Sequence, residues 1–97
     1  MSETGIKKQV IDEIIELAQK YQIKKVILFG SRARGDYYKT SDIDLAIEGG
    51  DSVRFALDVD EFTSTLLKYD IVDLNGIVQE ELLQSIKREG VVIYEKI

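Results

Sequence analysis

The stretch from Val26 to Leu45, VILFGSRARGDYYKTSDIDL, carries the strongest fold signals in the chain. It opens with four apolar residues, Val26–Phe29, whose β-branched and aromatic content favours a strand buried on both faces. Gly30 ends this run, and the composition of residues 30–38 predicts a turn that leads into a short helix or loop. Over residues 42–48 the odd positions are apolar and the even positions are mostly acidic. This alternation predicts a second strand with one acidic face.

The flanking segments show helical and strand periodicity in alternation. The expected elements are a helix over Ile6–Tyr21, a helix that Asp51 or Ser52 caps and that runs from Phe55 to Tyr69, a strand over Ile71–Leu74, a helix over about Val78–Arg88 that ends at Gly90 in the left-handed conformation, and a strand over Val91–Tyr94. This order predicts an α/β or α+β layer fold. With 97 residues, the chain is expected to form a single domain, 1–97.

The composition excludes several kinds of chemistry. The chain has no Cys and no His, which excludes disulfides, thiolate nucleophiles, Ser-His-Asp triads and zinc sites built on those residues. A formal net charge of −5 argues against nucleic acid or an anionic membrane as the main partner. No apolar stretch approaches the ~18 residues of a membrane-spanning helix, so we expect a cytoplasmic protein.

Gly30 and Ser31 form a candidate phosphate-binding turn. Because Gly30 ends a buried strand and has no Cβ, the backbone there can approach a ligand closely. The hydroxyl of Ser31 would add a donor to the free backbone N–H groups that follow. A Gly-Ser pair after a strand is more often only a turn with a helix cap, and the pair alone does not decide between these interpretations.

Carboxylates form the second candidate feature. Asp42 and Asp44 are two positions apart on a predicted strand, so their side chains leave the same face with Cα atoms about 6.6 Å apart. A solvated strand face is the alternative interpretation. Asp73 lies within an apolar strand, where its charge needs a partner such as an ion, an Arg or a turn, whereas Asp70 is interpreted as a turn residue. Three such oxygen donors would suit Mg²⁺.

Together these residues resemble a known signature. Gly30-Ser31, ten intervening residues, Asp42-x-Asp44 and the later Asp73 are similar to the motif of the DNA polymerase beta nucleotidyltransferase superfamily. The string GSRARG…SDIDL and the closing REGVVIYEK resemble its minimal nucleotidyltransferase branch, the MntA-like antitoxins of HEPN/MNT toxin-antitoxin pairs. The resemblance implies the nucleotidyltransferase fold, with a mixed central sheet of about four strands flanked by helices.

The resemblance also implies a role for each residue. Gly30 and Ser31 would hold the β and γ phosphates of a nucleoside triphosphate. Arg32 is expected to bind the nucleotide as well, and contact of Arg32 and Arg34 with phosphates or a partner stays open against the alternative of solvated side chains. Asp42 and Asp44 would ligate two Mg²⁺ ions, and Asp73 would ligate the catalytic ion and help to deprotonate the attacking hydroxyl. Two ions about 3.5–4 Å apart would stabilise the attacking oxygen and the leaving pyrophosphate.

Three functions remain open at this point. The first is a Mg²⁺-dependent enzyme that transfers AMP from ATP to a hydroxyl, expected to be a Tyr, of a HEPN ribonuclease toxin, and so acts as an antitoxin in a hetero-oligomer. The second is an antitoxin that neutralises its partner by stoichiometric binding, without catalysis. The third is a small subunit that modifies aminoglycosides, which would need an added acceptor-binding chain. No direct contact with nucleic acid is expected.

Overall fold

Helices and short strands alternate along the chain. The computed structural model describes residues 4–97. Its elements are α1 (Lys8–Lys20), β1 (Lys25–Phe29), α2 (Ser31–Arg34), β2 (Ile43–Glu48), α3 (Ser52–Phe62), β3 (Tyr69–Asp73), α4 (Glu80–Glu89) and β4 (Val91–Glu95). The strand predicted from the apolar run and the strand predicted from the alternating run are therefore both present.

The four strands form one mixed sheet in the order β3-β2-β1-β4. The central strand β1 pairs antiparallel with both β2 and β4. β2 and β3 run parallel, and α3 makes the crossover that a parallel pair requires. The expected α/β fold with a mixed sheet of four strands is confirmed. β2 therefore lies between β1 and β3, which brings residues of three strands together at one end of the sheet.

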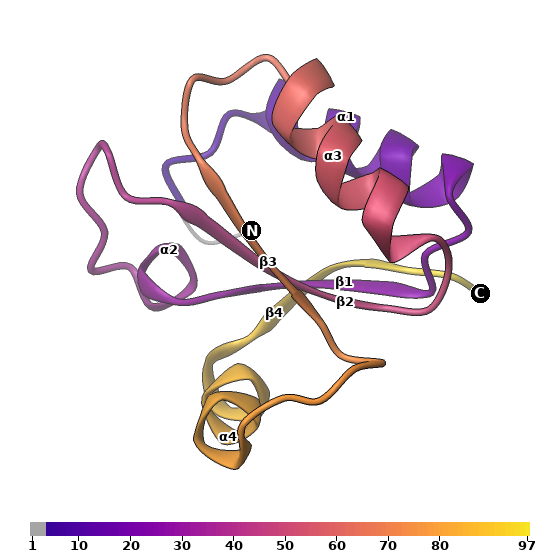
Figure 1. Cartoon of the computed structure of the whole chain (residues 1–97). Coiled ribbons are helices and arrows are strands. Elements are labelled where there is room, and N and C mark those ends of the chain that lie inside the picture. Colours follow the sequence, from indigo (N-terminus) through magenta and orange to yellow (C-terminus); the bar gives the residue numbers. More distant parts are fainter. Residues whose placement is uncertain (1–3) are drawn as a thin grey trace.

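Helices cover both faces of the sheet (Figure 1). α1 and α3 lie side by side on one face, and α4 lies against the other. The larger core is formed where the sheet meets α1 and α3, and it includes fully buried Ile14, Leu28, Leu45 and Phe55. A smaller cluster under α4 joins Phe29 and Ala46 to Ile86. The even-numbered face of β2 is acidic only at its ends, Asp44 and Glu48, because Ala46 between them is buried under α4.

The third helix is shorter than its periodicity predicts. It ends at Phe62, and Thr63 has extended backbone angles. The Thr63 hydroxyl donates to the Val59 carbonyl at 2.6 Å and lies 2.8 Å from the Tyr69 hydroxyl. This contact fixes the end of the helix and sets the start of β3. The expected continuation of the helix to Tyr69 is therefore wrong. Leu66 fits the helical spacing of apolar residues only by coincidence, because its side chain is fully exposed.

Gly90 ends α4 in another way than expected. Its φ of −64° and ψ of 142° describe extended backbone, so the predicted left-handed cap is wrong. A Cβ at this position would lie 2.4 Å from the Ile86 carbonyl oxygen and 2.6 Å from Ile27 Cγ2. Glycine is needed here because α4 and β1 approach closely.

Among the described residues, no helix is both long and apolar enough to cross a membrane.

Candidate active site

Three carboxylates meet where β2 and β3 begin. Asp44 is the second residue of β2, and its pairing partners are Phe29 on β1 and Asp70 on β3. Residues paired across neighbouring strands project from the same face, so Asp44 and Asp70 share the face that α4 covers further along. Asp42 precedes the strand by one residue and is exposed. Asp42, Asp44 and Asp70 are defined here as the acidic cluster.

The acidic cluster adjoins the predicted phosphate turn. Gly30 follows β1 directly, and its φ of 76° lies in the region that favours glycine. A Cβ on Gly30 would lie 2.1 Å from Asp44 Oδ2. Any other residue would therefore clash with the carboxylate as well as strain the backbone. Ser31, half-buried, begins α2 immediately afterwards. The geometry thus brings Gly30 and Ser31 together with Asp42 and Asp44, as the sequence indicated.

The surroundings of Asp44 disfavour its charged form. Partial burial, with the neighbouring charges of Asp70 and Asp42, raises the pKa of Asp44 from 3.8 to about 6. The guanidinium groups of Arg34 and Arg32 oppose this shift but do not cancel it. A carboxylate in such a position gains stability when a cation arrives, because the cation relieves both the repulsion and the lost hydration.

Asp73 does not join the cluster, and the prediction that placed it there is wrong. Its pairing partner is Ile47, at the other end of β2, and an offset of three residues from Asp70 turns its side chain to the opposite face of the sheet. There its carboxylate accepts hydrogen bonds from the Ser52 hydroxyl at 2.8 Å and from the Asn75 backbone N–H at 2.9 Å. These bonds lower the pKa of Asp73. Asp73 stabilises a turn and the start of α3.

Asp70 is the residue that the sequence interpretation missed. It lies within β3, between Tyr69 and Ile71, rather than in a turn before the strand. Both Asp70 and Asp73 stand between apolar residues, so the sequence pattern fits either one. One signal in the sequence was available: residues 70 and 73 are an odd number of positions apart, so a strand that presents Asp70 to the face of Asp44 must turn Asp73 to the other face. The register of β2 against β3 decides between the two.

Arg32 is a structural residue in this fold, and its predicted contact with nucleotide is contradicted. The side chain is 1% exposed. Its Nε donates to the Ser41 carbonyl at 3.0 Å, and its two terminal nitrogens donate to the carbonyls of Thr4 and Lys39 at 2.9 and 3.2 Å. The guanidinium carbon lies 4.9 Å from the centre of the Tyr37 ring. No part of this group is available to a phosphate, because it holds the loop that leads to Asp42.

Arg34 is the more accessible arginine of the turn. Its guanidinium contacts Asp36 at 3.2 Å and Glu89 at 3.0 Å, which links α2 to the end of α4. Its charge also acts on Asp44. Arg34 is therefore the arginine of α2 whose side chain remains exposed.

The donor set is suited to Mg²⁺, which prefers carboxylate oxygens and keeps several ligands from water or phosphate. Within residues 4–97, no three acidic side chains stand close enough together to hold a metal ion by themselves. An open set of carboxylates beside the predicted phosphate turn has the chemistry for an ion that shares its ligands with a triphosphate.

Comparisons with known proteins identify the family of this fold. The family described as polymerase beta, nucleotidyltransferase matches residues 12–97. Two proteins of Methanocaldococcus jannaschii, each named "Putative protein adenylyltransferase", are similar to the chain. One is 41% identical over 99 residues, covering 90% of this chain and 96% of its own length. The other is 32% identical over 82 residues, covering 80% and 84%.

Solved structures show the same fold. The crystal structure of a toxin-antitoxin with AMP-PNP matches with a TM-score of 0.73 at 23% identity, over 89% of this chain and 73% of that chain. A mutant of the toxin-antitoxin MntA-HpeT matches with a TM-score of 0.71 at 21% identity, over the same shares of the two chains. Fold and family together define an enzyme that transfers a nucleotidyl group. The chain belongs to the polymerase beta nucleotidyltransferase family.

Replacing Asp44 by asparagine should stabilise the metal-free protein at neutral pH. A pKa raised from 3.8 to about 6 means that the folded state binds this proton more tightly than the unfolded state. The contribution of protonated Asp44 to the free energy of unfolding is fully present below about pH 4 and is lost as the pH rises through 6. A shift of this size corresponds to roughly 3 kcal/mol, which solvent screening of the half-exposed group reduces to about 1–2 kcal/mol.

Urea unfolding in the presence of a chelator, at pH 4.5 and pH 8, measures this effect. Asp44→Asn should be more stable than the natural chain at pH 8 and nearly equal to it at pH 4.5. Asp73→Asn is the matched control with the opposite sign, because the lowered pKa of Asp73 means that its charged form contributes stability at pH 8. A destabilised Asp44→Asn protein at pH 8 would show instead that the carboxylate has a structural role.

Proposed function

We propose that this nucleotidyltransferase transfers AMP from ATP to a hydroxyl, expected to be that of a Tyr, on a partner protein. The partner is a HEPN-type ribonuclease toxin, and the transfer silences it in the cytoplasm. One observation supports this proposal above the others: the Asp44 carboxylate lies against Gly30, so that the acidic cluster adjoins the predicted phosphate turn. The relatives named as protein adenylyltransferases and the toxin-antitoxin structures support the acceptor class.

The residues divide the work of the reaction. The turn at Gly30 and Ser31 would bind the β and γ phosphates, and Arg34 would add positive charge beside them. Asp42, Asp44 and Asp70 would hold two Mg²⁺ ions. When bound, the ions supply the positive charge that stabilises the α phosphate and the leaving group. Asp70 takes the role that the sequence interpretation gave to Asp73, at the attacking hydroxyl.

The transfer exchanges one phosphorus–oxygen bond for another. The acceptor hydroxyl oxygen bonds to the α phosphorus, and its proton passes to the Asp70 carboxylate. The bond between the α phosphorus and the oxygen that bridges to the β phosphate breaks, and pyrophosphate leaves with that electron pair. The products are an AMP-protein phosphodiester and pyrophosphate. Positioning and charge stabilisation account for the rate in such a scheme, and no histidine is required.

Intact-mass spectrometry of the toxin tests the proposal. After incubation with this protein, Mg²⁺ and ATP, the toxin should gain the mass of one or more AMP groups and lose ribonuclease activity. Chelation of the metal, or Asp44→Ala, should abolish the mass gain. A different result decides for the alternative: if the toxin mass stays constant while Asp44→Ala still neutralises it, stoichiometric binding is the mechanism and the enzymatic proposal is wrong.

A further inference from the structure

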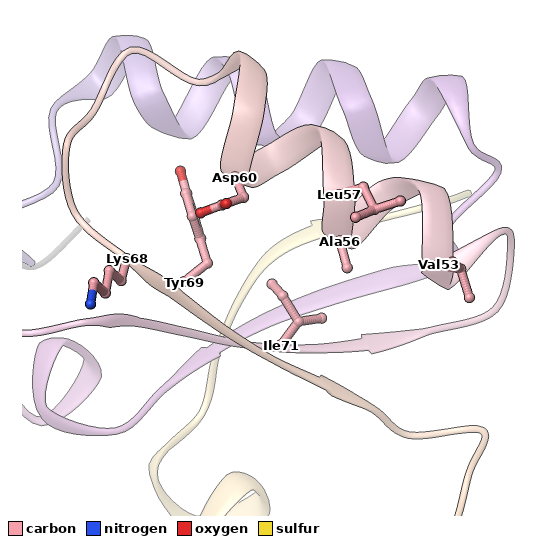
Figure 2. A pocket seen from close by; sticks show the side chains of 7 residues that line it. All are labelled: Val53, Ala56, Leu57, Asp60, Lys68, Tyr69 and Ile71. Carbon is pink, nitrogen blue, oxygen red and sulfur yellow. The ribbon is translucent and has the colours of Figure 1, made fainter.

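The outer edge of β3 is open. β3 is the last strand on its side of the sheet, and β2 is its only strand neighbour within residues 4–97. β3 carries Asp70 of the acidic cluster near its start, and its outer edge passes an apolar groove under α3 (Figure 2). We propose that an extended segment of the acceptor protein adds to this edge as a fifth strand and so delivers its hydroxyl to the cluster. This inference rests on the proposed function and specifies how the acceptor binds.

The backbone of β3 presents unpaired groups to this edge. Ile43 N–H donates to the Lys68 carbonyl, and Leu74 N–H donates to the Ile47 carbonyl. The backbone N–H and C=O groups of the even-numbered residues of β3 therefore point toward β2. Because successive residues of a strand alternate, the N–H and C=O groups of Tyr69 and Ile71 and the N–H of Asp73 point outward, whereas the Asp73 carbonyl already accepts a hydrogen bond from Gly76 N–H. An open row of this kind is a template for strand addition.

The groove beside the edge supplies an apolar anchor site. Val53 and Leu57 lie one turn apart on α3 and are 70% and 63% exposed. Figure 2 shows them above Ile71, with Ala56 between helix and strand. Together with Asp60, Lys68 and Tyr69 they line a space of about 690 Å³. Two large aliphatic side chains exposed beside an open strand edge are typical of a binding surface.

The charges along this surface favour a basic acceptor segment. Asp60 stands at the rim of the groove with Lys68, and Asp73 lies further along the same face of β3. These three side chains give a local excess of one negative charge, in line with the −5 of the whole chain. We therefore specify the occupant as an extended segment with an aliphatic anchor and neighbouring Lys or Arg residues.

The alternation of side chains along the added strand sets the sequence spacing between the acceptor's apolar anchor residue and its hydroxyl-bearing residue. The groove lies on the face of the sheet that α1 and α3 cover, whereas Asp44 and Asp70 project from the other face. Side chains of a strand alternate between these faces. The hydroxyl-bearing residue of the acceptor must therefore stand an odd number of positions from its apolar anchor.

Lysine substitutions in the groove test the anchor. Val53→Lys and Leu57→Lys change exposed side chains, so the fold should be kept, and they both remove apolar area and repel a basic segment. We expect the KM for the toxin to rise about tenfold or more with kcat within about threefold, because only binding of the acceptor is lost. Val92→Lys is the matched control, since Val92 is a half-exposed valine on the opposite edge strand, β4.

Amide exchange measured by NMR tests the strand addition itself. Binding of the toxin should protect the outward amides of Tyr69, Ile71 and Asp73. A complex that forms without this protection, or groove variants with unchanged KM, would overturn the inference. Self-association of the isolated protein, lost in Leu57→Lys and measured by light scattering, would do the same by assigning the edge to a second copy.

The two proposals can fail separately. If the toxin binds but is never modified, the proposed function fails, and the affinities of Leu57→Lys and Val92→Lys for the toxin still decide the docking edge. If the toxin is modified equally well by every variant, the function stands and the docking edge is wrong.

Discussion

Asp70→Asn should lower the rate of AMP transfer by about 100-fold or more, whereas Asp73→Asn should leave it within about threefold of the natural rate. The two substitutions are chemically identical and lie three residues apart on the same strand. The two variants differ only in the face of the sheet from which the changed side chain projects. Asp70 is the pairing partner of Asp44, whereas Asp73 is paired with Ile47 and bonded to Ser52 and Asn75.

Single-turnover transfer to the toxin, with saturating ATP and Mg²⁺, is the appropriate measurement. Binding of Mg²⁺ and ATP by Asp70→Asn should be reduced less than transfer, because Asp42, Asp44 and the turn at Gly30 remain. Equal losses of transfer in both variants would contradict the assignment. A large loss in Asp73→Asn alone would restore the interpretation based on sequence and would mean that the register of β3 shifts in the functional complex.

Arg32→Ala should destabilise the protein by about 3 kcal/mol or more. The guanidinium is fully buried and holds the carbonyls of Thr4, Lys39 and Ser41, which the alanine variant would leave without a donor in a buried place. Arg32→Lys should recover only part of the loss, because a single ammonium cannot reach acceptors in three directions.

Thermal unfolding of the isolated protein measures this effect. Arg34→Ala is the matched control: its side chain is on the surface, so its melting temperature should change little while nucleotide binding weakens. The contrast separates the two arginines of one short helix into a structural and a ligand-binding member. An Arg32→Ala protein with an unchanged melting temperature and impaired nucleotide binding would reverse these roles.

Much of this fold could be predicted from the sequence because its strands carry strong local signals. The apolar run at Val26–Phe29 and the alternating run that ends at Glu48 each contain enough β-branched residues to specify a strand and its buried face. The end of α3 could not be predicted, because the apolar spacing continues to Leu66, beyond the hydroxyl contact of Thr63 that ends the helix.

The proximity of Gly30 to the carboxylates of Asp42 and Asp44 could also be predicted, because these residues are close in sequence and their spacing relates them. The third carboxylate is different. It comes from a strand that joins the sheet through a helical crossover, and the choice between Asp70 and Asp73 depends on a register between distant segments. Arg32 was misassigned for a similar reason: its backbone partners extend from Thr4 to Ser41, and carbonyl groups leave no trace in a sequence.

The anchoring of the segment between α2 and β2 has a thermodynamic consequence. This segment lacks regular secondary structure, yet a buried guanidinium ties several of its carbonyls together just before Asp42. The conformational entropy of ordering Asp42 is therefore lost when the chain folds and not when the nucleotide binds. Association with Mg²⁺ and ATP should accordingly show a small entropic penalty, and the segment that leads to Asp42 should resist amide exchange as strongly as the core beneath it.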